Sequence, residues 1–335
     1  MPMPLSGQIT LDDARKQLNY PPTSAISLND NSVRTMFEKP GADSAQIGLF
    51  DGYGKFGPAV NYSIYFLVAG GGGAGGAGRR DRSGGAGSGG GGGGLTIGTL
   101  TVNRTNFSGS ILVGNGGLPD YSFEAQNGFN GHHSQLSISS GAGSYTRTAG
   151  GGGGGGGDRR PGGAGGANDT TYINPGGPSR QQGGTGGANG GGGGGGADDS
   201  THGQYNKGGD GAIWTITGER YCGGGGGGGD GGDGGYNGGA GGGGSGKSST
   251  TGAQGEDYRG GGGGGGASWG NDSWNFGGRG GSGIVILKHF ASYGQLFRVD
   301  GGSSVLYDQS WITYLAYIVN TGSVQESKTI VWVGS

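Results

Sequence analysis

Six long blocks of glycine constrain this chain more than any other feature of its sequence. They contain four to eight consecutive glycines and lie at residues 70–73, 89–94, 150–157, 190–196, 223–229 and 260–266. Glycine weakens helices and strands because it has no side chain to pack and loses the most backbone entropy on ordering. Two conformations remain for such blocks: a disordered linker, or an array of threefold helices of the polyproline II type whose backbone groups bond to neighbouring chains.

The borders of the glycine region favour the ordered array. Residues 61–69 and 283–290 are rich in β-branched and aromatic side chains, which is typical of strands, and each stretch abuts glycine. Further strand-like stretches at 95–102, 110–113 and 135–139 predict a small sheet that supports the array. A linker does not usually begin and end inside strands, so we expect order.

The two ends of the chain differ from the glycine-rich middle. Residues 1–57 repeat the pattern Ile-x-Leu-x-Asp from Ile9, Ile26 and Ile47, and short helices after the first two copies predict a small α+β module. From residue 291 the glycine blocks stop. Strand-like stretches separated by turns then predict a β-rich module over 291–335, with strands at 296–299, 304–307, 311–319 and 329–333.

Four motifs carry a resemblance to a known family: FLVAGGGGAGG at 66–76, SILVGNGG at 110–117, NGHHSQL at 130–136 and GGSGIVIL at 280–287. In this order they resemble the glycine-rich domain family common in phage tail proteins. The chain is also similar to the distal tail-fibre adhesins of T-even-like phages, over roughly residues 60–290. This resemblance implies polyglycine-II bundles in the glycine-rich domain.

The predicted fold class is therefore irregular and β. It consists of a polyglycine-II helix bundle framed by β-strands over residues 58–290, a small N-terminal α+β anchor over 1–57 and a β-rich C-terminal module over 291–335. Ile-x-Leu-x-Asp modules occur at the start of many phage tail and baseplate proteins. That resemblance implies that residues 1–57 attach the protein to other phage tail or fibre proteins; the alternative is a small cap that stabilises the glycine-rich domain.

Segments of different composition interrupt the glycine blocks and supply the candidate binding residues. Chain reversals at these segments are expected to gather them at the ends of the bundle. Their mixture of rigid aromatic, arginine and small polar residues is also favoured by antibody binding loops. The candidate receptor-binding residues are Arg79, Arg80, Tyr172, Tyr205, Trp214, Tyr258, Trp269 and Trp274. The alternative for any one of them is that it covers the end of the bundle.

Several functional classes are disfavoured. A formal net charge of −2 provides no basic surface for nucleic acid, and without an apolar run of 18 residues we expect no membrane insertion. Residues 241–248 fit the P-loop pattern, but no apolar strand precedes them. Residues 228–236 resemble one calcium-binding nonapeptide, whereas that architecture needs at least three stacked units. We therefore expect no cofactor, no metal site and no catalysis.

The sequence and the resemblance together predict a bacteriophage tail receptor-binding protein, or adhesin. It would recognise a bacterial outer-membrane protein or a surface glycan through aromatic loops on a polyglycine-II scaffold. It would be a component of the virion, assembled in the host cytoplasm. The alternatives are a purely structural tail-tip or baseplate protein and, from another class, an ice-binding protein.

Overall fold

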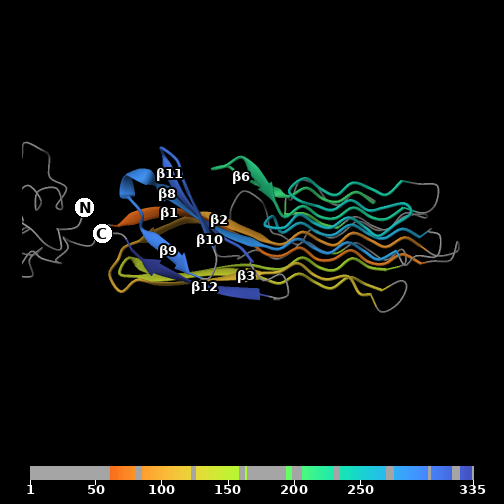
Figure 1. Cartoon of the computed structure of the whole chain (residues 1–335), viewed down its shortest axis with the longest axis horizontal. Helices are drawn as coiled ribbons and strands as arrows, with labels where there is room; N and C mark the ends of the chain where they lie inside the picture. Colours follow the sequence, from red (N-terminus) through yellow and green to blue (C-terminus); the bar gives the residue numbers. More distant parts are fainter. Residues whose placement is uncertain are drawn as a thin grey trace, which may run out of the picture.

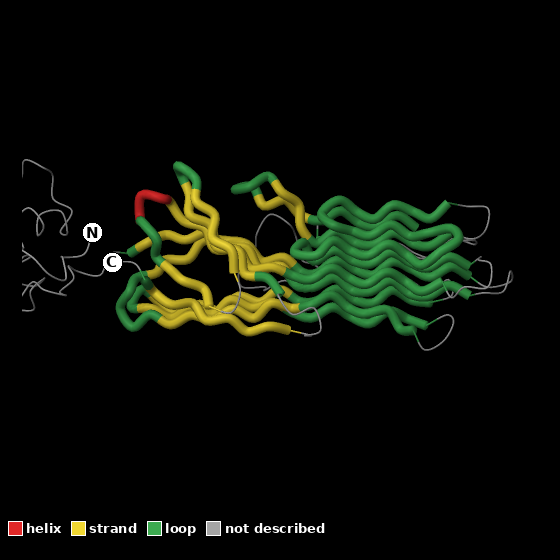
Figure 2. Tube along the Cα trace, viewed as in Figure 1, coloured by secondary structure: helices red, strands yellow, loops and turns green. Residues whose placement is uncertain are grey.

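The computed structural model describes residues 61–79, 85–121, 126–157, 163, 194–197, 206–229, 234–268, 275–300, 303–318 and 325–333. Two regions follow one another along the long axis of the molecule (Figure 1). One is built from β-strands, and the other from extended glycine segments that continue out of those strands (Figure 2). Residues 1–57, where an attachment module is predicted, lie outside the described residues.

Two antiparallel five-stranded sheets form the strand region. The first has the order β10-β11-β8-β1-β2, with β1 (Tyr62–Ala69), β2 (Leu95–Val102), β8 (Ile284–Phe290), β10 (Ser303–Tyr307) and β11 (Trp311–Ala316). The second has the order β5-β4-β3-β12-β9, with β3 (Ser108–Gly114), β4 (Ser134–Ser140), β5 (Gly143–Ala149), β9 (Phe297–Asp300) and β12 (Gln325–Trp332). A 3₁₀ turn (Ala291–Tyr293) follows β8.

The two sheets enclose the main hydrophobic core. Alternation along the strands points every second side chain inward; on β1, for example, Ile64, Phe66 and Val68 are fully buried. They pack with residues of both sheets, including Leu136 of β4 and Leu287 of β8. Strand β1 lies between β8 and β2, so the chain enters the glycine region from an interior strand of the sheet.

A second, smaller core lies on the outer face of the first sheet. Leu67 of β1 and Ile286 of β8 point to this face, and a short hairpin packs against them. The hairpin consists of β6 (Ala212–Trp214) and β7 (Glu219–Tyr221). It covers the part of the sheet that adjoins the glycine region (Figure 1).

The glycine segments are held together by lateral backbone hydrogen bonds with a period of three residues. Successive amides of segment 70–79 donate in rotation to segments 85–94, 126–132 and 275–281. Gly70, Gly73 and Gly76, for example, donate to Gly94, Gly91 and Ser88 at 2.8–3.0 Å. Carbonyls of the same segment accept from other neighbours, so its backbone groups are paired without any ladder of strand or helix.

At the glycine positions between these segments there is no room for a side chain. A Cβ atom added to Gly75 would lie 2.1 Å from the carbonyl oxygen of Gly264, and one added to Gly263 would lie 2.0 Å from that of Gly278. Real Cβ atoms essentially never approach closer than 3.0 Å. The glycine blocks are therefore required by the close approach of neighbouring backbones.

The predicted fold class is wrong. Regular structure in the described residues consists of two five-stranded antiparallel sheets, the β6–β7 hairpin and one 3₁₀ turn. These residues contain no α-helix, which overturns the predicted helix bundle framed by strands and gives no support to an α+β anchor. The C-terminal strands do not form a separate module either. Strand β11 pairs with β8 and strand β12 with β3, so residues after 290 complete both sheets.

Candidate functional site

Five interruptions of the glycine segments are bordered by described residues that lie together. They lie at the end of the glycine region away from the sheets. Arg79 donates its amide to the carbonyl of Gly85 at 3.0 Å, and Gly78 donates to Asn275 at 3.0 Å. Ser268 donates to Gly229 at 3.2 Å. We call this the distal end; its described boundary residues are Arg79, Gly85, Tyr121, Gln126, Gly157, Gly229, Ser268 and Asn275 (Figures 1 and 2).

Large apolar side chains are exposed from the middle of the glycine region towards this end. Leu118, Tyr121 and Phe129 are 55%, 64% and 59% exposed. The ring of Tyr121 meets that of Phe276 edge to face, with the ring centroids 5.0 Å apart. The Phe129 amide donates to the Leu118 carbonyl at 3.0 Å, which links the two segments that carry these side chains. We call Leu118, Tyr121, Phe129 and Phe276 the rim patch.

The rim patch cannot be buried by turning inward. A Cβ on the neighbouring Gly117 would lie 2.0 Å from the carbonyl oxygen of Phe129, and one on Gly128 would lie 2.4 Å from that of Ala74. The interior is therefore closed to even a methyl group at these positions. Leu118, Tyr121 and Phe129 on these segments face outward instead.

Three of the eight candidate binding residues lie in the described part of the chain, and they are not together. Arg79 is exposed at the distal end. Tyr258 is 45% exposed but lies in the turn at the opposite, sheet-side end, where its ring meets that of Tyr317 with centroids 5.1 Å apart. Nine residues of extended chain, roughly 28 Å, separate the two ends. Arg80, Tyr172, Tyr205, Trp269 and Trp274 lie outside the described residues.

Trp214 does not lie on a binding surface. Its side chain is only 2% exposed and belongs to the smaller core under the β6–β7 hairpin. Its carbonyl accepts hydrogen bonds from the Thr217 and Gly218 amides, at 3.0 and 2.8 Å, which closes the hairpin turn. The physical reason for the correction is that a short apolar strand covers the sheet where the sequence suggests an exposed loop.

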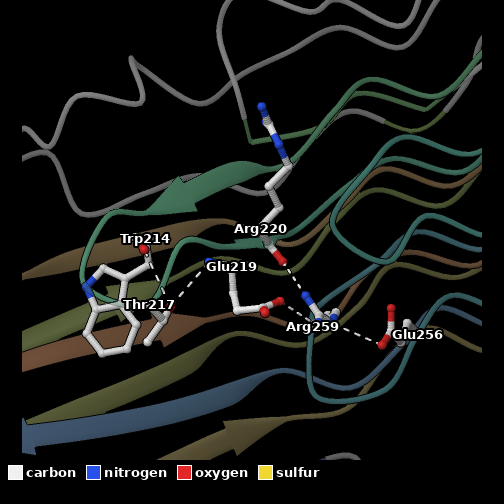
Figure 3. Close-up of polar contacts among 6 residues, drawn as sticks. All are labelled: Trp214, Thr217, Glu219, Arg220, Glu256 and Arg259. Carbon is white, nitrogen blue, oxygen red and sulfur yellow. Dashed lines mark hydrogen bonds and ion pairs between the residues drawn. The ribbon is translucent and has the colours of Figure 1, made fainter.

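A charged network fixes this hairpin to the turn that contains Tyr258 (Figure 3). Arg259 pairs with Glu256 at 3.0 Å and with Glu219 at 2.9 Å, and its guanidinium also donates to the Arg220 carbonyl at 2.9 Å. Burial alone would lower the pKa of Arg259, but the hydrogen bonds and charges of the two glutamates raise it. The network therefore holds the sheet-side turn in place, and its charges are already paired.

The described residues give no support to a metal or phosphate site. They contain no group of three or more His, Cys, Asp or Glu side chains that could hold a metal ion. Within the P-loop-like stretch, the amides of Gly244 and Gly246 already donate to the carbonyls of Gly262 and Tyr236.

Cys222 is fully buried, and burial raises the pKa of its thiol. In this part of the chain no helix is both long and apolar enough to cross a membrane.

Sequence reasoning missed the rim patch. It singled out Trp, Tyr and Arg in the segments between glycine blocks, whereas Leu118 and Phe129 stand among glycine, asparagine and proline in stretches that looked like turns. The signal that could have found them is a lone large apolar residue flanked by glycines, because a glycine array has no interior to receive it.

A family model described as a glycine-rich domain matches residues 54–290. No curated protein sequence matches the chain.

Proposed function

The chain belongs to the glycine-rich domain family, and from this premise and the geometry of the distal end we propose that it is an adhesin, the receptor-binding protein of a bacteriophage tail. The rim patch is the observation that carries the proposal. Exposed apolar clusters of this kind mark interaction sites more often than they serve stability. In this fold they add nothing to a core, because the glycine interior excludes them.

The glycine region suits a scaffold for recognition. Its segments are cross-linked by backbone hydrogen bonds on several sides, so residues at the distal end are held in place before a partner arrives. Such preorganisation reduces the entropy lost on binding. Exposed aromatic anchors on a rigid frame are typical of binding hot spots.

The partner in this proposal is a bacterial outer-membrane protein or a surface glycan. Residues 1–57 would attach the protein to other tail or fibre proteins, and the whole would belong to the virion. Several copies on one particle would raise the overall avidity without any new contact. Support for the phage assignment comes from the motif resemblance and the Ile-x-Leu-x-Asp repeats.

The proposal is tested by measuring binding of the labelled full chain to a diverse panel of bacterial strains. Binding should be restricted to certain strains, and the double variant Tyr121→Ser with Phe129→Ser should weaken it at least about tenfold. The matched control is Tyr307→Ser, because Tyr307 is 61% exposed, close to the 64% of Tyr121, but lies on β10 in the sheet region. All variants should melt like the unmodified protein, since the changed side chains are exposed.

Two results would overturn the proposal. One is an absence of binding to every strain even when the protein is displayed in many copies on a bead, which would favour the structural tail-tip or baseplate role. The other is an equal loss of binding in the Tyr307→Ser control and the rim variant, which would remove the rim patch from recognition.

A further inference from the structure

A hydroxyl-lined groove lies on the outer face of the second sheet, on a different part of the molecule from the distal end. Its volume is about 330 Å³, which is within the range of small-ligand sites. Six of its lining residues are serine or threonine, two from each of the neighbouring strands β3, β4 and β5: Ser108, Ser110, Ser137, Ser139, Ser144 and Thr146. Gly109, Ile138 and Tyr145, which lie between them along the strands, complete the lining.

The register of the strands arranges these hydroxyls in two rows. Ser139 of β4 is paired with Ser108 of β3 on one side and Ser144 of β5 on the other. The second row, two residues along each strand, joins Ser110, Ser137 and Thr146 in the same way. Neighbouring strands are about 4.8 Å apart, so the six hydroxyls form a small regular lattice.

The hydroxyl face is a consequence of strand alternation. On β4, Leu136 and Ile138 are 0% and 2% exposed and point into the core, whereas Ser137 and Ser139 between them are half-buried on the opposite face. The neighbouring Ser110 and Thr146 are exposed. Changes to these outward side chains therefore leave the core unaltered.

The hydroxyls are oriented before any ligand binds. Ser139 Oγ and Ser144 Oγ are 2.7 Å apart, and Ser137 Oγ and Thr146 Oγ1 are 3.4 Å apart. A hydroxyl has one donor and two acceptor sites, so each pair keeps spare capacity for both roles after its mutual bond. Short side chains around the hollow also leave space for a flat ligand to reach them.

The chemistry of the lining selects the class of ligand. None of the described residues that line the groove is charged, so an anion such as phosphate would find no arginine or lysine and a cation no carboxylate. A neutral saccharide presents a row of groups that each donate and accept hydrogen bonds, like the serines themselves. We propose that this groove is a binding site for a neutral oligosaccharide.

The test is a titration of the ¹⁵N-labelled full chain with neutral trisaccharides of glucose, galactose and mannose, followed by NMR. An acidic trisaccharide of galacturonate serves as the comparison. At least one neutral sugar should shift the amide signals of residues 108–110, 137–139 and 144–146. The double variant Ser137→Ala with Ser139→Ala removes two hydrogen-bonding groups and should weaken binding about tenfold.

The matched control is Ser327→Ala, which removes an exposed hydroxyl from β12, on the same sheet but outside the groove. Binding should be unchanged in this variant. The inference is overturned if no neutral trisaccharide shifts the groove amides at millimolar concentration, if galacturonate binds more tightly, or if Ser327→Ala weakens binding as much as the groove variant does.

This site does not rest on the proposed function. A rim variant should leave the sugar titration unchanged. In a groove variant the sugar should bind more weakly, and the amide signals that it shifts should still be those of the groove. Failure of cell binding with an intact titration therefore refutes the adhesin proposal alone, and the reverse result refutes the groove alone.

Discussion

Replacing Gly75 by alanine tests the physical basis of the glycine region directly. The new Cβ would lie 2.1 Å from the Gly264 carbonyl oxygen, so segment 260–268 would have to retreat by about 1 Å. Two hydrogen bonds join these segments on either side of the contact: Gly263 donates to Gly73 at 2.9 Å and Gly266 donates to Gly76 at 3.0 Å. Both bonds would lengthen with that movement.

The expected loss of stability follows from these contacts. Overpacking costs roughly 1–3 kcal/mol, and each buried backbone pair that loses its partner costs about 1–3 kcal/mol. Alanine also restricts the unfolded chain, which returns about 0.4–1 kcal/mol. A net loss of roughly 2–9 kcal/mol is therefore expected, a large part of the usual 5–15 kcal/mol of a folded domain.

Differential scanning calorimetry on matched variants provides the measurement. Gly75→Ala should lower the melting temperature by at least about 4 °C. Gly234→Ala is the control, because a Cβ there meets nothing within 4 Å while the effect on the unfolded chain is the same. If the two variants melt within about 1 °C of each other, the glycines are not required by backbone contact and the reasoning fails.

Three further changes test the packing around the cores. Burial lowers the pKa of His289, so the unfolded protein binds a proton on this imidazole more readily than the folded protein does. The melting temperature should therefore fall as the pH drops below about 6.5, and it should fall less in the variant His289→Gln. Burial raises the pKa of the Cys222 thiol, so a thiol reagent at pH 8 should modify it only on unfolding, and rapid labelling of the folded protein would contradict its position. Arg259→Ala should cost about 1 kcal/mol in urea unfolding and speed amide exchange in β7, whereas Glu256→Gln should cost less because the pair with Glu219 remains. Equal effects of the last two variants would show that the Glu219 pair contributes nothing.

Local sequence patterns predicted where many strands lie. The stretches at 61–69 and 95–102 coincide with β1 and β2, because β-branched and aromatic side chains fit a half-buried pleated surface. Pairing between distant strands could not be read in the same way. Strand β12 lies beside β3, more than two hundred residues earlier, and a strand's own alternation does not identify its neighbour.

The positions of the candidate binding residues were harder to predict than the strands, because composition does not say which side of a short segment is buried. Trp214 stands in a short stretch between glycine blocks and reads as part of a loop, yet three residues of β6 suffice to place it over the sheet. Tyr258 has the expected exposure but a backbone φ of 63°, and its turn lies at the sheet-side end. Which end a turn occupies depends on where the preceding glycine segment began, and that is a property of the whole topology.

The glycine region separates stability from recognition more completely than an ordinary core does. In a conventional domain a surface side chain often shares its element with buried ones, so a change in binding residues affects packing. Here the interior contacts are made by backbone atoms, and the Gly117 and Gly128 positions beside Leu118 and Phe129 exclude side chains altogether. Substitutions on the rim should therefore change the partner without changing the frame, while substitutions at interior glycines should do the opposite. In the adhesin that we propose, this division would let the rim patch change while the frame persists, which suits recognition of a variable target.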